Sequence, residues 1–327
     1  MSLFTIARTD SVVGRKLVKR LLARGDQLLD PRALDHAAKI VDDVRARGDR
    51  AVRQAVRKFD GVATKDVATL CRRPMRVRGN ELPPGFEAAL ERAILAVERY
   101  HRPQRRDGYR LDEDGIELRE RRRPLKRVAC YVPGGRAAYP SSVVMTVVPA
   151  RLAGVPEIVV ATPPGSYQRN AALRHTLARL GIEEVWTFGG AHAVAALAYG
   201  TESVPRVDKI VGPGNQWVTA AKYLTSSSVA IDGLAGPSEV VIVAGGDVDP
   251  AWIAADLLAQ AEHDPLATAL LITDDRSLAR AVRREVSIQL RSLATASTAR
   301  ESLRNNGGAL LVERMDDALD LLERLAP

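Results

Sequence analysis

Hydrophobic positions recur at two different spacings along the chain, and the spacing changes near residue 128. Before about residue 110, apolar residues return every three or four positions, which predicts amphipathic helices. These helices are expected over 12–23, 31–46, 51–59 and 83–101. From residue 127 onward, short apolar runs alternate with helical stretches, as is typical of βαβ units in a parallel sheet.

The alternating part of the chain predicts most of the sheet-forming segments. Apolar runs rich in Val and Ile predict strands over 127–132, 157–161, 184–188, 208–211, 239–244, 268–273 and 309–312. Helices are expected near 141–153, 169–180, 191–199, 215–224 and 250–264. We therefore predict an α/β fold with two Rossmann-like parallel-sheet domains and a helical N-terminal lead-in.

The composition is that of a globular chain. With 327 residues, 46% of them apolar and 27% charged, it is long enough for two domains. No apolar run approaches the roughly 20 residues of a membrane span, and no signal peptide is recognisable. Cys71 and Cys130 are too few for a disulfide framework, which favours a cytoplasmic location.

The formal net charge of +8 raises the question of nucleic-acid binding. Aromatic residues make up only 4% of the chain, and none interleave with the basic cluster over 121–127 as a stacking platform would require. A solvated basic face, or attraction for an anionic substrate and cofactor, is the better interpretation. Nucleic-acid binding stays a minor alternative.

The segment 231–265 contains a candidate metal site. Gln260 and His263 lie three positions apart in the last turn of a predicted helix, so their side chains project from one face. Neutral histidine is a common zinc ligand, whereas glutamine is an unusual one. Most such pairs are simply solvated or bonded to the backbone. His36 and His101 are expected to be surface or structural residues, and His175 is expected to lie on the surface.

Glycine-rich turns after two predicted strands are candidate anion sites. In 131–135, the paired glycines would let backbone N–H groups approach an anion, although a plain turn is equally compatible. In 212–215, a Gly-Pro-Gly-Asn turn opens a helix, whose amino end favours anions. No third glycine completes the dinucleotide fingerprint. Ser238 sits in a Gly-Pro turn without the nucleophile elbow of a serine hydrolase.

Several of these segments resemble the histidinol dehydrogenases, a family of NAD-dependent zinc enzymes. The similar blocks are 44–49, 58–61, 130–136, 139–142, 201–205, 207–215, 236–239 and 259–265. The resemblance covers most of the chain from about Arg45 onward. It implies oxidation of L-histidinol through L-histidinaldehyde to L-histidine, with NAD and zinc as cofactors, in an intertwined homodimer.

The resemblance also implies roles for individual residues. Tyr131 and Asn215 match NAD contacts, and His192 stands where the family has a glutamine, which leaves its NAD contact in question. Ser238, Gln260 and His263 match substrate-binding positions, and the last two also match metal ligands. The implied domains are an arm over 1–25, a discontinuous first domain over 26–129 and 239–327, and an NAD-binding second domain over 130–238.

The resemblance places the family's catalytic Glu-His pair directly after Pro327, followed by two further zinc ligands. No catalytic residue is therefore expected within 1–327, and we expect weak metal binding and little turnover. A truncated form of a longer enzyme is favoured over a shortened paralogue. Two alternatives remain, namely a zinc- and NAD-dependent alcohol dehydrogenase for another hydroxyl substrate, and a non-catalytic NAD-binding paralogue.

Overall fold

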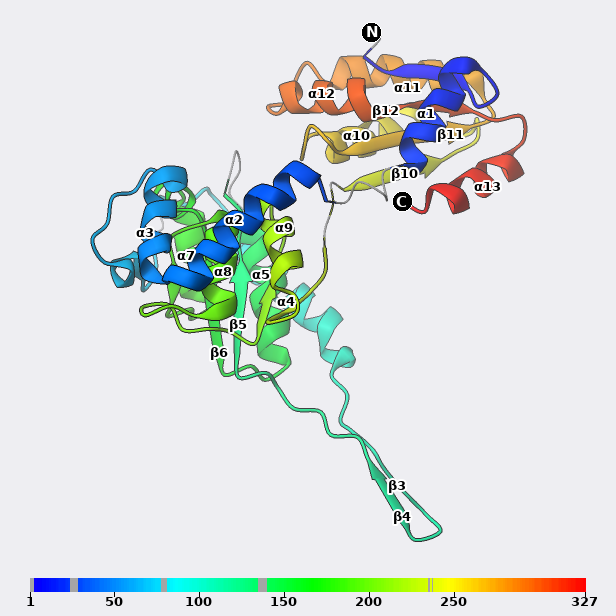
Figure 1. Ribbon diagram of the computed structural model, residues 1–327. Helices are drawn as coiled ribbons and strands as arrows, with labels where there is room; N and C mark the ends of the chain where they lie inside the picture. The colour runs from blue at the N-terminus through cyan, green and yellow to red at the C-terminus, as the bar shows by residue number, and fades with distance from the viewer. Residues whose placement is uncertain (1–2, 24–28, 78–80, 135–139, 235, 237) are drawn as a thin grey trace. The chain divides into compact units, whose positions relative to one another are not determined.

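The chain folds into two compact units, each built on its own sheet (Figure 1). The computed structural model describes residues 3–23, 29–77, 81–134, 140–234, 236 and 238–327. Unit 1 comprises residues 1–28 and 235–327, and unit 2 comprises residues 29–234. The parallel sheets in both units confirm the predicted α/β fold class. Of the motif residues named above, Gly135, Arg136, Tyr139 and Pro237 lie outside the described residues.

This division corrects the predicted domain boundaries. Residues 29–129 do not join 239–327, because the helices over 31–55 pack on helices of unit 2. The expected N-terminal helical arm over 1–25 is also wrong in part, since strand β1 (Thr5–Arg8) precedes its helix and belongs to the sheet of unit 1.

Unit 1 is a four-stranded parallel sheet covered on both faces. Its strand order is β1, β12 (Gly307–Leu311), β11 (Thr268–Thr273), β10 (Glu239–Val243). Side chains of a strand alternate between faces. Along β11, Ala269 and Leu271 therefore pack in one core cluster and Leu270 and Ile272 in another.

Five helices cover the two faces of the unit 1 sheet. The cluster that holds Leu271 includes residues of α10 (Pro250–Ala261), α11 (Arg276–Gln289) and α12 (Ala296–Asn306). The cluster that holds Leu270 includes residues of α1 (Val12–Leu22) and α13 (Met315–Leu325). Helix α10 ends at Ala261, three residues before the predicted end.

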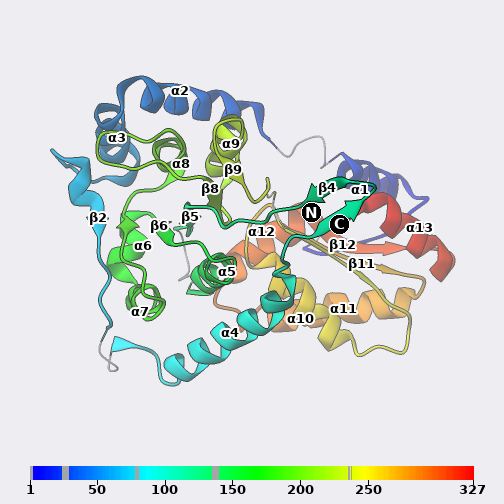
Figure 2. The same cartoon turned by 90° about the horizontal axis from the view of Figure 1, so that it is seen from below.

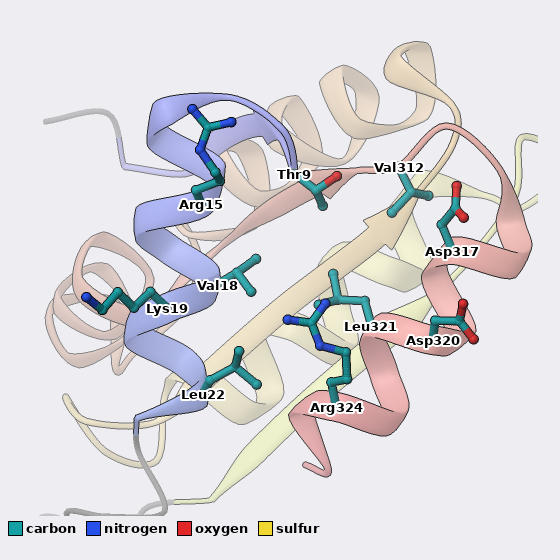
Figure 3. A pocket seen from close by; sticks show the side chains of 10 residues that line it. All are labelled: Thr9, Arg15, Val18, Lys19, Leu22, Val312, Asp317, Asp320, Leu321 and Arg324. Atoms are coloured by element: carbon teal, nitrogen blue, oxygen red, sulfur yellow. The ribbon is translucent and has the colours of Figure 1, made fainter.

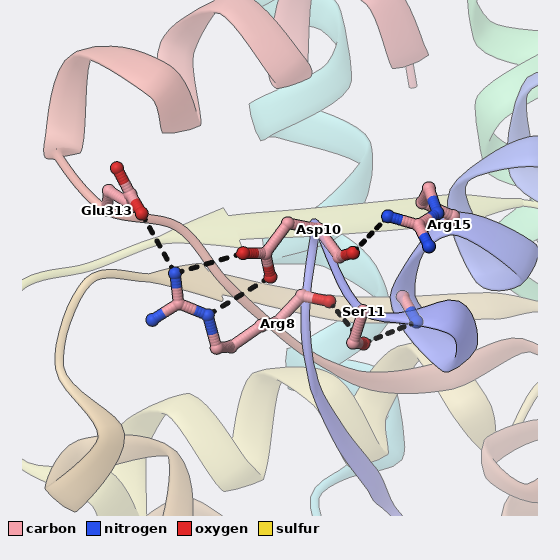
Figure 4. Close-up of polar contacts among 6 residues, drawn as sticks. Arg8, Asp10, Ser11, Arg15 and Glu313 are labelled. Carbon is pink, nitrogen blue, oxygen red and sulfur yellow. Dashed lines mark hydrogen bonds and ion pairs between the residues drawn. The ribbon is translucent and has the colours of Figure 1, made fainter.

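Polar contacts at the end of β1 attach the N-terminal segment to the sheet (Figure 4). The Arg8 guanidinium donates to Asp10 at 3.0 Å and to Glu313, beyond β12, at 2.9 Å. Ser11 caps α1, because its Oγ donates to the Arg8 carbonyl at 2.6 Å and accepts from the Gly14 N–H at 3.0 Å. The ion pairs are exposed and contribute little stability each.

Unit 2 is a six-stranded sheet that is parallel except at one edge. Its order is β2 (Cys71–Arg72), β7 (Val185–Trp186), β6 (Glu157–Ala161), β5 (Arg127–Tyr131), β8 (Lys209–Val211), β9 (Ala230–Ile231). Only β2 is antiparallel to its neighbour. On β5, Ala129 and Tyr131 face one core cluster and Cys130 faces the other.

Helices cover both faces of this sheet as well (Figure 2). One side has α2 (Pro31–Arg47), α3 (Asp49–Ala55), α8 (Gly190–Tyr199) and α9 (Gln216–Thr225). The other has α4 (Phe86–His101), α5 (Pro140–Leu152) and α7 (Ala171–Arg179). Shorter pieces are η2 (Val56–Asp60, a π-helical turn), η3 (Val67–Leu70), η5 (Arg102–Gln104) and α6 (Pro164–Arg169).

A β-hairpin that the periodicity analysis missed projects from unit 2 (Figure 1). Strands β3 (Arg110–Glu113) and β4 (Ile116–Arg119) pair antiparallel, and every residue in them is exposed. Asp114 and Gly115 form the turn, both with positive φ, and this Asp-Gly pair was the available sequence signal.

The prediction that His175 lies on the surface is wrong, because this residue is buried and only 3% exposed. Its Nδ1 lies 3.3 Å from the Val77 carbonyl oxygen. None of the described helices is both long and apolar enough to cross a membrane.

The close approach of α1 to β1 predicts a strong effect of one methyl group. A Cβ on Gly14 would lie 1.9 Å from the Arg8 carbonyl oxygen. We expect Gly14→Ala to lower the free energy of unfolding by roughly 1–3 kcal/mol, because the backbone must shift. Urea unfolding measures this. Gly233→Ala, where a Cβ meets nothing within 4 Å, is the control, and equal effects of the two changes would contradict the prediction.

Candidate functional site

A cavity of about 460 Å³ opens at the carboxyl ends of the central strands of unit 2. Loops that follow β5, β6, β7 and β8 contribute to its wall, which is where ligands bind in open parallel sheets. Its lining residues are His36, Ile40, Phe59, Asp60, Tyr131, Pro133, Gly134, Pro163, Gly189, Gly190, Ala191, His192, Asn215 and Trp217. Tyr131 and Asn215, which are predicted to contact NAD, and His192, whose predicted contact is in question, are therefore in one cavity.

Tyr131 is the last residue of β5 and is 3% exposed. Its hydroxyl oxygen accepts a hydrogen bond of 2.9 Å from the Gly190 N–H, at the first residue of α8. The pKa of Tyr131 is raised to about 12, mainly by burial. The hydrogen bond from the Gly190 N–H lowers this pKa, and the charge of Asp60 raises it. The side chain therefore stays a neutral phenol at physiological pH and positions the start of α8.

His192, on the first turn of α8, is paired with Asp60. The distance from His192 Nε2 to Asp60 Oδ2 is 2.9 Å, and the imidazole is 1% exposed. The imidazole is stacked against Phe188 (centroids 6.0 Å apart, 19° between planes) and Phe59 (6.1 Å, 23°). Nε2 is occupied by Asp60, so only Nδ1 of this ring is left for another partner.

Asn215 begins α9 as its N-cap. Its Oδ1 accepts from the Trp217 N–H at 3.1 Å and the Val218 N–H at 3.2 Å. The side-chain amide N–H groups are not used by this cap and can donate to a ligand. The predicted role of an anion-binding helix start is compatible with this geometry.

The Gly-Pro-Gly-Asn turn is fixed by a charge pair between the buried Lys222 and the exposed Asp232, which sequence analysis missed. The Gly212 N–H donates to Asp232 Oδ2 at 2.7 Å, and Lys222 Nζ donates to the Gly212 carbonyl at 3.1 Å. Lys222 also pairs with Asp232 and is 3% exposed. Gly212 has φ +113, and a Cβ there would lie 2.2 Å from the Tyr131 carbonyl oxygen. Only glycine fits this position.

Aromatic side chains form one wall of the cavity. The rings of His36 and Trp217 are 5.1 Å apart, those of His36 and Phe59 are 5.9 Å apart, and Phe59 is 45% exposed. Flat rings of this kind bind flat heterocycles by stacking. Sequence analysis assigned His36 no role, because nothing in α2 indicates that it packs beside α9.

Glycines allow a close approach on the opposite side of the cavity. A Cβ on Gly134 or Gly189 would lie 2.6 Å from Pro163 Cγ, so these backbones and the proline ring are in contact. Helix α8 has no side-chain N-cap bond. Aromatic rings, two helix amino ends and a carboxylate together suit the rings, phosphates and hydroxyls of a nucleotide.

The other three predicted residues lie in unit 1, at the amino ends of β10 and β11. The Ser238 carbonyl accepts from the Thr268 N–H at 3.1 Å, and His263 follows the end of α10, with its N–H bonded to the Gln260 carbonyl at 3.3 Å. Ser238 and His263 are exposed.

The described residues do not complete a metal site. They contain no group of three or more His, Cys, Asp or Glu side chains that could hold a metal ion. Gln260 Nε2 is buried without a hydrogen-bond partner among the described residues, so this amide has unused bonding capacity. Two ligands are fewer than the three or four that zinc requires.

Unit 1 has a second cavity, of about 520 Å³, between α1 and α13 (Figure 3). Arg15 and Lys19 are on α1, and Asp317, Asp320 and Arg324 are on α13. It contains none of the residues singled out from the sequence. Its mixture of charges and apolar side chains indicates no single ligand chemistry.

The mostly parallel sheet of unit 2, with helices on both faces, is that of the Rossmann-like α/β proteins. A family model for histidinol dehydrogenase matches residues 24–327. The histidinol dehydrogenase of Rhizobium meliloti (strain 1021) is 46% identical over 290 residues, covering 88% of this chain and 67% of that protein. That of Moorella thermoacetica is 46% identical over 321 residues, covering 96% and 74%.

A solved structure agrees with these sequence matches. The crystal structure of histidinol dehydrogenase from Elizabethkingia anophelis has a TM-score of 0.82 and 28% identity, and the match covers 100% of this chain and 75% of that one. The chain belongs to the histidinol dehydrogenase family, which is a family of oxidoreductases.

The buried phenol of Tyr131 predicts a loss of stability at alkaline pH. Its pKa is raised from 10.0 to about 12 on folding, so its contribution is complete below pH 10 and is lost as the pH rises toward 12. Between pH 10 and pH 12 we expect the free energy of unfolding to decrease in both proteins, but less in Tyr131→Phe than in the parent. The difference between the two decreases should be on the order of 1–3 kcal/mol. Urea unfolding at several pH values measures it. Tyr100→Phe, at a residue that is 72% exposed, is the control, and an unchanged slope for Tyr131→Phe would contradict the prediction.

Proposed function

We propose that this chain binds NAD in the cavity of unit 2 and takes part in the zinc-dependent oxidation of L-histidinol, through L-histidinaldehyde, to L-histidine. One observation carries the proposal. Tyr131 and Asn215, which match the family's NAD contacts, and His192, which replaces the glutamine of a third, come from three separate elements and line a single cavity.

The chain's own side chains support cofactor binding in distinct ways. The wall of Trp217, His36 and Phe59 offers stacking to a ring. Asn215 and the amino end of α9 suit the pyrophosphate, which carries negative charge. When bound, NAD⁺ accepts a hydride from the substrate carbon.

For the substrate and metal we propose Ser238, Gln260 and His263 in unit 1. The unpartnered amide of Gln260 and the exposed imidazole of His263 supply potential ligands. Because two ligands do not complete a zinc site, we derive no reaction step through the metal. No residue within 1–327 is proposed as the general base.

The proposal also covers location and the alternatives. We propose a cytoplasmic protein, since both cysteines are free. An oxidoreductase for another hydroxyl substrate would keep the same cofactor pocket. A non-catalytic NAD-binding protein would bind NAD without turnover even with zinc added.

A titration with NADH tests cofactor binding directly. Trp217 lines the cavity, so its fluorescence should be quenched on binding. We expect His36→Ala to weaken binding about 10-fold, because one stacking surface is lost. His101→Ala removes a histidine of the same unit that is absent from the lining and should leave the dissociation constant unchanged.

The absence of NADH binding to the parent chain would overturn the proposed cofactor role. The reaction itself is followed by NADH formation from L-histidinol and NAD⁺, with and without zinc, beside a panel of other alcohols. Oxidation of another alcohol in place of L-histidinol would favour the related dehydrogenase.

The exposed hairpin supports the proposal of a homodimer. Leu111 and Leu118 are directly opposite each other in its register, and Ile116 lies on the same face, each at 51–63% exposure. Arg110 pairs with Glu117 on the opposite face at 2.9 Å. An isolated two-stranded ribbon is marginally stable in water, so an apolar face of this kind needs a partner surface.

We expect the Leu111→Ser, Leu118→Ser double variant to shift a dimer toward monomer. The dimer is weakened because apolar area is removed from the interface, and each leucine contributes roughly 1.5–3 kcal/mol when it is fully buried. Sedimentation over a range of concentrations measures the dissociation constant. Leu319→Ser, at an exposed leucine of unit 1, is the control. A parent chain that is monomeric throughout would contradict the proposal.

A further inference from the structure

We propose that Asp60, held in place by His192, makes this chain select NAD over its 2′-phosphorylated form, NADP. The carboxylate accepts hydrogen bonds from ribose hydroxyls and repels a phosphate at the same position. This inference rests on the proposed NAD site and names the residue that decides which dinucleotide enters it.

Asp60 is fixed at the cavity by contacts from distant parts of the chain. It is the last residue of the π-helical turn η2, and Gly61 ends that turn with a left-handed conformation at φ +69. Its Oδ2 accepts from His192 Nε2 at 2.9 Å and is 3.4 Å from the Gly189 nitrogen. Its side chain is 10% exposed. The carboxylate therefore has a defined direction.

The hydrogen bonds of Asp60 leave one oxygen for a ligand. Both contacts are to Oδ2, and Oδ1 has no hydrogen-bond partner among the described residues. A carboxylate oxygen accepts hydrogen bonds only, so it suits the hydroxyl groups of a ribose. An acidic residue that accepts from the ribose 2′-OH is the usual means of choosing NAD in such folds.

The charge around Asp60 disfavours a second phosphate. The described residues that line the cavity include no Lys or Arg, and Asp60 is their only carboxylate. Lys58 stands 5.1 Å from the centroid of the Phe59 ring and is not part of the lining. Acceptance of a 2′-phosphate usually needs an arginine nearby, whereas the one formally charged side chain among the described lining residues is the Asp60 carboxylate, which repels a phosphate beside it.

His192 acts as a positioning residue for Asp60. Its Nε2 lies 2.9 Å from Asp60 Oδ2, and because a carboxylate only accepts hydrogen bonds, the imidazole is the donor in this contact. Stacking against Phe188 and Phe59 fixes the ring plane and hence the direction of this bond. Glutamine, the family's residue at this position, can donate a similar bond through its amide but offers no ring for stacking.

The test compares the dissociation constants of NADH and NADPH for the parent chain and matched variants. We expect the parent to bind NADH at least about 100-fold more tightly, and Asp60→Asn to reduce this ratio about 10-fold or more, because removal of the charge removes the repulsion. Asp42→Asn makes the same charge change on an exposed residue of unit 2 and should leave the ratio unchanged.

The role of His192 has its own readout. We expect His192→Ala to lower the NADH/NADPH ratio, because the carboxylate loses its defined direction, and His192→Gln to restore most of it. Thermal unfolding of each variant separates these effects from loss of fold. Equal ratios for His192→Ala and the parent would contradict the positioning role.

The outcomes separate the two proposals. If the parent chain binds NADH and NADPH with similar dissociation constants, this inference is overturned while the proposed function stays intact. That measurement needs no variant. An unchanged ratio in folded Asp60→Asn would do the same. Failure of the parent to bind either dinucleotide would overturn the proposed function and this inference together.

Discussion

The packing of two loops against Tyr131 is the constraint on which the cavity of unit 2 depends. The hydroxyl of this residue accepts from the Gly190 N–H and so positions the amino end of α8. Its carbonyl oxygen would lie only 2.2 Å from a Cβ at residue 212, so the turn that leads to α9 must have glycine at this position. One strand end thereby brings two helix amino ends to the same cavity, and both favour an anionic ligand.

The part of the site that follows from βαβ topology could be predicted from sequence. Tyr131 ends strand β5, His192 and Asn215 follow strands β7 and β8, and the carboxyl ends of parallel strands share one edge of a sheet. His36 and Asp60 could not be placed, because both come from the helical region before the sheet. They reach the cavity through packing of α2 and α3 on α8 and α9, which hydrophobic periodicity does not specify.

The errors in the fold have a common physical origin in contacts between residues far apart in sequence. Strand β1 pairs with β12, about 300 residues later, and four residues such as Thr5–Arg8 carry too short a pattern to indicate a strand. Strand β2 has only two residues. Strands 157–161 and 268–273 were predicted with their observed limits, since buried parallel strands are continuous apolar runs that turns delimit on both sides.

The proposed NAD-binding residues and the proposed metal ligands differ in how complete a site they form within one unit. Every described residue that lines the proposed NAD pocket belongs to unit 2, and so do Lys222 and Asp232, which fix its glycine turn. The proposed metal ligands of unit 1 are not among these lining residues. Gln260 and His263, by contrast, belong to no group of three or more His, Cys, Asp or Glu side chains among the described residues that could hold a metal ion. The proposed cofactor site and the proposed metal site can therefore be tested independently, and the first has the more complete set of residues within one unit.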